Sequence, residues 1–141
     1  MRSAPRRRHP SREYRRRLRG VGAFGDLRQL SPLGIWDGVA ARAVTGERLS
    51  LAIVELDPGS VVAEHRHPHE QLGMVLRGSV RFRVGGEERE LGPGETWRIP
   101  GGVPHEVHTG PDGAEVIDVF APAREDWEAV EQQEPRQPRW P

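Results

Sequence analysis

His65-Arg66-His67-Pro68-His69-Glu70-Gln71 is the stretch of this 141-residue sequence around which the rest is organised. His65 and His67 are separated by one residue, so an extended strand places both imidazoles on the same face, because side chains alternate across a pleat. Gln71 lies four residues after His67 and returns to that face if the strand stays regular. His105 follows a turn rich in proline and glycine. The sequence therefore offers three nitrogen donors and one amide oxygen that can converge on a divalent metal.

The remaining sequence is typical of a β-protein. Its 13 prolines and 17 glycines separate short apolar runs, a pattern that favours many strands joined by tight turns. We expect strands over 39–44, 48–56, 61–63, 72–76, 79–84, 87–91, 95–99, 105–109 and 114–121, and a short helix within 123–133. Strands at this spacing indicate an all-β sandwich or barrel.

Length and charge predict one domain with two extensions. A chain of this size supports a single core, which we place at 21–130, followed by a Pro-rich tail at 131–141. Residues 1–20 carry nine arginines and one glutamate, whereas the remaining 121 residues carry 12 arginines and 20 acidic residues. We interpret the basic segment as a flexible extension. A nucleic-acid patch is the alternative, but only Tyr14 offers a ring for base stacking, so we do not expect a nucleic-acid partner.

Several classes are excluded by composition. There is no cysteine, so disulfides, thiolate metal sites and thiol nucleophiles are impossible. No apolar run approaches the roughly 18 to 20 residues of a membrane span, and the N-terminus lacks the apolar segment of a secretory signal. We therefore expect a cytoplasmic protein with no membrane partner.

Two spaced motifs carry a family resemblance. Gly59-x5-His65-x-His67-x3-Gln71-x6-Gly78 resembles the first cupin motif, and Gly94-x5-Pro100-x-Gly102-x2-His105-x3-Thr109 resembles the second. The 15 residues between them match the short spacing of compact microbial cupins. The resemblance spans about residues 47–122 and implies a double-stranded β-helix, or jelly-roll barrel, with a metal in its mouth. The ligands it implies are His65, His67, Gln71 and His105.

The sequence departs from the cupin pattern at Gln71, where most members have glutamate, and at Thr109, where many have asparagine. An amide oxygen can ligate but brings no charge, so the ion keeps its full positive charge. This favours Lewis-acid polarisation of a carbonyl or enediol oxygen and gives less support to a ferric state. Nitrogen and neutral oxygen ligands suit Zn, Fe, Ni, Mn or Cu alike.

A finer resemblance lies downstream. Asp118-Val119-Phe120-Ala121-Pro122-Ala123-Arg124-Glu125-Asp126, together with the histidine run, is similar to the small cupins that ketonise unsaturated uronates during pectin and alginate breakdown. This similarity implies that Asp118 moves a proton, Phe120 forms a wall of the substrate site and Arg124 holds the anionic end of the substrate. The alternative is structural: a salt bridge between Asp118 and Arg124 at the barrel rim, with Phe120 as core packing.

Other residues receive weaker assignments. We place His69 either at the barrel mouth, behind the metal ligands, or on the surface. His108 falls on the opposite strand face from His105 and is expected to be exposed. Trp36 is expected to close the barrel bottom or to line an interface. The run 72–76 is apolar on both faces apart from Gly73, so we expect cover on both sides. Since jelly-roll cupins commonly pair through such faces, we predict a homodimer.

Three function classes follow. The first is a Lewis-acid isomerase, tautomerase or cyclase acting on a small oxygenated substrate, with an unsaturated sugar acid favoured by the resemblance and a natural-product substrate as the close rival. The second is an iron or nickel oxygenase, which would consume dioxygen. The third is a non-catalytic module that binds a small molecule in its barrel.

Overall fold

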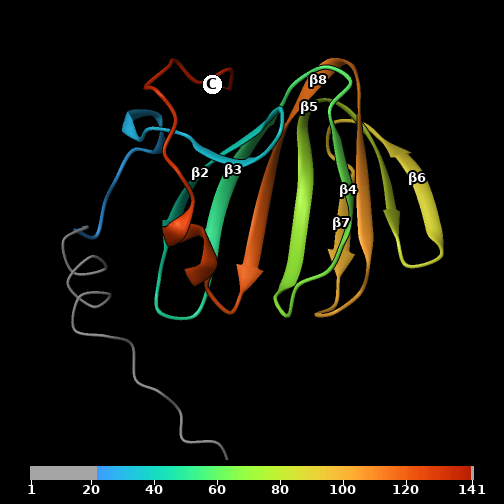
Figure 1. Cartoon of the computed structure of the whole chain (residues 1–141), viewed down its shortest axis with the longest axis horizontal. Coiled ribbons are helices and arrows are strands. Elements are labelled where there is room, and N and C mark those ends of the chain that lie inside the picture. Colours follow the sequence, from blue (N-terminus) through green and yellow to red (C-terminus); the bar gives the residue numbers. More distant parts are fainter. Residues whose placement is uncertain (1–21, 141) are drawn as a thin grey trace, which may run out of the picture.

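The computed structural model describes residues 22–140 (Figure 1). The extension predicted over residues 1–20 lies outside these residues. The described chain consists of strands with two short 3-10 helices, in the order η1 (Leu27–Gln29), β1 (Leu33–Trp36), β2 (Val39–Thr45), β3 (Ser50–Leu56), β4 (Val61–His65), β5 (Glu70–Val84), β6 (Glu87–Leu91), β7 (Thr96–Ile99), β8 (His105–Ala121) and η2 (Glu125–Ala129).

All strand pairs are antiparallel, and they follow the order β1-β2-β3-β8-β5-β6, with β4 also paired to β8 and β7 to β5. The long strands β5 and β8 lie at the centre of this arrangement (Figure 1). The second half of β8 pairs with β3 and with the start of β5, whereas its first half pairs with β4 and with the end of β5. The two long strands thus join both sides of the barrel, and the all-β jelly-roll prediction is confirmed.

The prediction of separate strands at 72–76 and 79–84 is wrong, because both belong to β5. Gly78 lies at the junction with φ of 80°, a left-handed conformation that glycine adopts without steric cost. Register shifts on either side of Gly78 bend the strand without ending it. A Cβ at this position would lie 2.0 Å from the Gly113 carbonyl oxygen on β8. The segments 105–109 and 114–121 are likewise joined in β8.

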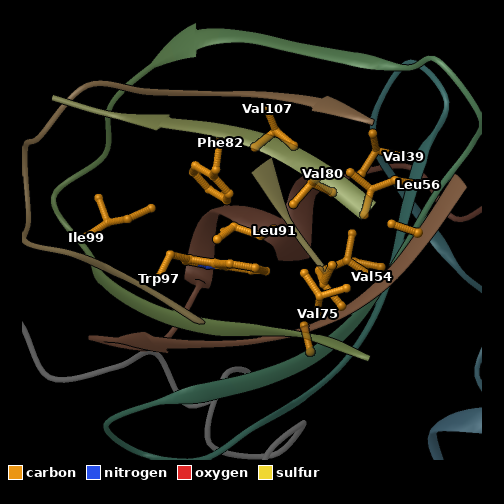
Figure 2. Close-up of a cluster of buried hydrophobic side chains, with 14 of the residues drawn as sticks. Val39, Val54, Leu56, Val75, Val80, Phe82, Leu91, Trp97, Ile99 and Val107 are labelled. Carbon is orange, nitrogen blue, oxygen red and sulfur yellow. The ribbon is translucent and has the colours of Figure 1, made fainter. Parts of the chain in front are cut away.

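The barrel interior is filled at one end by apolar side chains from opposing strands, which Figure 2 shows pointing toward one another. Val80 and Phe82 face inward, as their alternation with arginines predicted, and are 1% and 6% exposed. Phe82 packs on Trp97 of β7 with ring centroids 4.9 Å apart. This core leaves the opposite end of the barrel free for polar side chains.

The outer face of β5 is exposed in the single chain, so the expected cover on this face stays a prediction. Val75 is fully buried inside, but Leu72 and Leu76 remain 46% and 38% exposed in the single chain. Their cross-strand neighbours on β8 include Val119, which pairs with Leu72. The described part of the chain therefore does not supply the outer cover that the sequence suggested.

The C-terminal segment returns along the barrel. The helix expected within 123–133 is reduced to the 3-10 helix η2, which buries Trp127. Further on, Arg139 Nε donates to the buried carboxylate of Glu55 at 3.0 Å, and Arg42 also pairs with Glu55. Residues 131–140 are thus tied to the side of the sheet that faces away from the core. Across residues 22–140, neither helix has the length or the apolar character that a bilayer span requires.

Candidate metal centre

The three histidines predicted as ligands come together at the barrel mouth. His65 ends β4, His105 begins β8, and the two are cross-strand partners with ring centroids 4.3 Å apart. His67 lies in the β4–β5 connection, 4.9 Å from the His105 ring. The regular strand expected from His65 to Gln71 therefore does not form, since β4 ends at His65 and β5 begins at Glu70. The convergence is achieved by the loop instead.

Each of the three rings is held through its Nδ1 atom by a backbone carbonyl two residues away. The pairs are His65 with Ala63 at 2.9 Å, His67 with His69 at 3.0 Å and His105 with Val103 at 2.9 Å. Because a carbonyl oxygen only accepts, Nδ1 must carry the hydrogen in each ring. In a neutral imidazole the lone pair then lies on Nε2, which is the tautomer that a metal-ligating histidine needs.

The free ring nitrogens face a common point. One nitrogen from each of His65, His67 and His105 lies within 4.8 Å of the other two, a grouping suited to a metal ion. Nε2 of His105 is buried and has no hydrogen-bond partner in the described chain. Such an orphaned acceptor is costly unless something binds it. Burial is the main cause that lowers the pKa of His105, to about 4, so its ring stays neutral and able to ligate at neutral pH.

Gln71 adds a second unsatisfied contact. Its Nε2 donates to Asp118 Oδ1 at 2.9 Å, which turns its Oε1 toward His67 Nε2 at 3.1 Å. Because the hydrogen of His67 is on Nδ1, its Nε2 and Gln71 Oε1 are both acceptors, and their lone pairs repel at this distance. Burial lowers the pKa of His67, so protonation of the ring does not relieve the contact at neutral pH. A cation beside both atoms would relieve it, and the residues present therefore fit a metal ion.

Asp118 lies behind Gln71 and is 6% exposed. Its Oδ1 also accepts a hydrogen bond from Trp97 Nε1 at 3.0 Å. Burial raises its pKa to about 6, although the hydrogen bonds from Gln71 and Trp97 act in the opposite direction. Trp97 reaches this position because it packs flat on Gly73, where a Cβ would lie 2.2 Å from the indole. Asp118 lines the same cavity as the histidines.

Arg124 and Phe120 line the same cavity. The Arg124 guanidinium packs against the rings of Phe120 and Trp127, with Cζ 4.7 and 4.6 Å from their centroids. Its Nε and Nη2 atoms donate to Asp126 Oδ1 and Oδ2 at 3.0 and 2.8 Å. The salt bridge between Asp118 and Arg124, which was the alternative prediction, does not form, because Arg124 pairs with Asp126 instead. Phe120 is 3% exposed and also meets the His67 ring edge-on.

The cavity joins these groups to the apolar core. It has a volume of about 250 Å³, just below the range typical of drug-sized ligands, and so fits a small molecule. Its mouth carries the histidines, Gln71, Asp118 and Arg124. Its floor is formed by valines and Leu56, which Figure 2 shows converging inside the barrel.

Three further side chains with predicted positions are His69, His108 and Trp36. His69 is buried, packs edge-on against the His67 ring at 5.4 Å between centroids and does not line the cavity, which matches a place behind the ligands. His108 is exposed and pairs with Glu106 at 2.6 Å, as its strand face predicted. The prediction that Trp36 closes the barrel bottom is wrong, because its ring lies 5.7 Å from that of His65 and lines the cavity. The interface role of Trp36 stays a prediction.

No role in the site was predicted for Asp126, Trp127 or Trp36. Asp126 follows Arg124 by two residues, a spacing that places side chains on different faces of a helix, so no periodic pattern links them. Trp36 belongs to the β1–β2 hairpin and reaches the mouth only through strand pairing. A general tendency of exposed tryptophan to mark binding sites was the one available signal.

Comparisons with known proteins agree with this geometry. A family model described as a cupin domain matches residues 52–120. The pectin degradation protein KdgF of Dickeya dadantii (strain 3937) is 29% identical over 93 residues, covering 64% of this chain and 84% of KdgF. Oxalate decarboxylase OxdC of Bacillus subtilis (strain 168) is 30% identical over 94 residues, covering 59% of this chain but only 24% of OxdC. The structure of KdgF from Halomonas sp. has a TM-score of 0.69 at 28% identity, covering 75% of this chain and 98% of that one. The described chain thus has the cupin fold, and its residues 52–120 match a cupin domain.

Proposed function

We propose that this cupin is a metal-dependent isomerase that ketonises a small unsaturated sugar acid. The observation that carries the proposal is the meeting of three Nε2 lone pairs and one neutral amide oxygen beside a buried carboxylate and an arginine. The similarity to two KdgF proteins, one of them a pectin degradation protein, supports a uronate as the substrate class. We assign His65, His67, Gln71 and His105 as ligands of one divalent ion, which would supply Lewis-acid polarisation of an enol or carbonyl oxygen.

Ketonisation is an isomerisation and consumes no co-reactant. One proton is added to a carbon of the C=C–OH unit, and the hydroxyl proton is lost as the C=O bond forms. Asp118 is suited to deliver or accept a proton, because burial raises its pKa to about 6, close to the operating pH of a general acid or base. Its Oδ1 is fixed by Gln71 and Trp97, so we assign the proton transfer to Oδ2.

The other residues bind and orient the substrate. Arg124 is assigned to the substrate carboxylate, since a guanidinium can bind a carboxylate through two parallel hydrogen bonds. Phe120 forms the wall between Arg124 and His67. The apolar floor of the cavity excludes water from the reacting end and limits the substrate to about the size of a monosaccharide.

The direct test is turnover of an unsaturated uronate monomer, followed by loss of the ultraviolet absorbance of its conjugated double bond. Asp118→Ala should abolish turnover while metal content stays unchanged. A protein that retains its metal but leaves the unsaturated uronate intact would exclude the proposed reaction. Retained activity in Asp118→Ala would return Asp118 to a structural role.

A second candidate is a cyclase or tautomerase for an apolar natural-product substrate, and the valine-rich cavity floor favours it. Such a substrate would need no carboxylate, so Arg124→Gln should leave its turnover unaffected. The 30% identity to about one quarter of OxdC, an oxalate decarboxylase, also supports a small carboxylic acid as the substrate. Oxygen consumption during turnover would distinguish an oxygenase from either isomerase.

We also propose that the chain forms a homodimer in the cytoplasm through the outer face of β5, where Leu72 and Leu76 are exposed. Analytical ultracentrifugation at micromolar concentration tests the dimer, and Leu72→Glu should dissociate it. A wild-type protein that sediments as a monomer would contradict this.

A further inference from the structure

Arg124 and its partner Asp126 differ in their exposure to solvent. Its side chain is 11% exposed, whereas the side chain of its partner Asp126 is 53% exposed. Asp126 therefore holds the arginine from the solvent side. Asp126 is no part of the metal-ligand set, and the proposed reaction does not yet use it.

The pair occupies one edge of the guanidinium. Nε and one N–H of Nη2 are donated to Asp126, and a guanidinium carries five N–H donors. Three donors remain, two of which run parallel from Nη1 and Nη2. Nη1 makes no hydrogen bond to residues 22–140, and it is not among the buried atoms that lack a partner, so it is accessible. A parallel pair of donors is the geometry that binds a carboxylate.

Two aromatic rings pack against the guanidinium. Its Cζ lies 4.7 Å from the ring centroid of Phe120 and 4.6 Å from that of Trp127, and these two rings meet edge-on with centroids 5.1 Å apart, so both pack on the same side of Arg124. The rings and Asp126 together hold the guanidinium, and the edge formed by Nη1 and Nη2 is left for a ligand. Arg124 and Asp126 both line the cavity.

We propose that Asp126 is a positioning residue, which fixes Arg124 so that its open edge faces the cavity and selects substrates that carry one planar carboxylate. This inference rests on the proposed function in one respect, namely that the substrate is a sugar acid. It adds the residue that makes the site discriminate the acid from the corresponding neutral sugar.

The first experiment measures binding without turnover. Metal-loaded protein is titrated by calorimetry with D-galacturonate and with D-galactose, and the ratio of the two affinities is compared among variants. Asp126→Ala should lower the affinity for galacturonate roughly tenfold, as expected when a charge-assisted contact loses its alignment, and should leave galactose binding unchanged. Glu128→Gln removes a negative charge from an exposed side chain of the same helix η2 and should leave the ratio as in the wild type.

A purely structural role of Asp126 would weaken both sugars together, so the ratio separates the two possibilities. The double variant Arg124→Gln/Asp126→Ala tests the route of the effect. If Asp126 acts through Arg124, the double variant should bind galacturonate no more weakly than Arg124→Gln alone. Additive losses, an unchanged ratio in Asp126→Ala, or a wild type without preference for the acid would each overturn the inference.

Kinetics distinguish this inference from the proposed reaction. With an unsaturated uronate, Asp126→Ala should raise KM, whereas Glu128→Gln should not. If the wild type prefers galacturonate in an Asp126-dependent manner but does not turn over the unsaturated uronate, the proposed reaction fails and the positioning role stands. If turnover occurs with the same KM in Asp126→Ala, the positioning role fails alone.

Discussion

Replacing Trp97 by phenylalanine isolates the hydrogen bond that supports Asp118. Phenylalanine keeps a ring over Gly73 and against Phe82, but it removes the Nε1 donor that lies 3.0 Å from Asp118 Oδ1. The variant should lose stability from imperfect packing at every pH. It should lose further stability only where Asp118 is ionised.

The magnitude follows from the pKa of Asp118. Burial raises this pKa from 3.8 to about 6, so the native state holds a proton that the unfolded state has released. The free energy of unfolding should therefore fall as pH rises from 3.8 to 6, by about 3 kcal/mol in total. Loss of a hydrogen bond to a charged group costs roughly 1.5–3 kcal/mol, which raises the pKa by a further one to two units. In Trp97→Phe the decline should thus continue above pH 6.

The assay is urea unfolding of metal-depleted wild type and Trp97→Phe at about pH 5 and pH 8. The stability difference between them should grow by roughly 1.5–3 kcal/mol from the lower to the higher pH. Trp127→Phe is the matched control, because it replaces another buried indole, one with no carboxylate partner among residues 22–140, and its cost should be the same at both pH values. A difference between Trp97→Phe and wild type that does not change with pH would refute the proposed coupling of Trp97 to Asp118.

Further substitutions test other parts of the site. Gly73→Ala should destabilise the fold by about 1–3 kcal/mol, typical of overpacking, because its Cβ would lie 2.2 Å from the Trp97 indole; thermal unfolding measures this, and an unchanged midpoint would show that the indole moves freely. Gln71→Glu should raise metal affinity through its added negative charge, and it should lower activity because a second carboxylate then faces Asp118. Competition with a chelator measures the affinity and a turnover assay the activity. A fall in metal affinity would contradict this prediction. Trp36→Ala should raise KM without changing metal content, because its ring lines the mouth beside His65, and an unchanged KM would remove Trp36 from the substrate site.

The convergence of His65, His67 and His105 could be predicted from sequence because the spacing of the histidines is tied to the barrel. His105 begins β8 opposite His65 at the end of β4, and two motifs at fixed spacing specify this pairing. The exact route was less predictable. His67 reaches the site from a loop and not from a regular strand, because the chain leaves β4 directly after His65.

Other features depended on contacts that no local pattern records. Gly78 and the glycines of β8 indicated strand ends, yet a bulge with positive φ lets a strand bend and continue. Arg124 was expected at the substrate, but its pairing with Asp126 was not, since alternative carboxylates were present at several spacings. The pKa of Asp118 is raised by burial and lowered by the hydrogen bond from Trp97, a residue 21 positions away in sequence.

The most direct measurement of the central claim is the metal content of the purified protein and of two histidine variants. Elemental analysis should find one divalent ion per wild-type chain, little or none in His105→Ala, and a full ion in His108→Ala, whose side chain is exposed on the other face of β8. A wild-type protein that binds no ion after incubation with divalent metals, or a His105→Ala protein that keeps its full complement, would contradict the account.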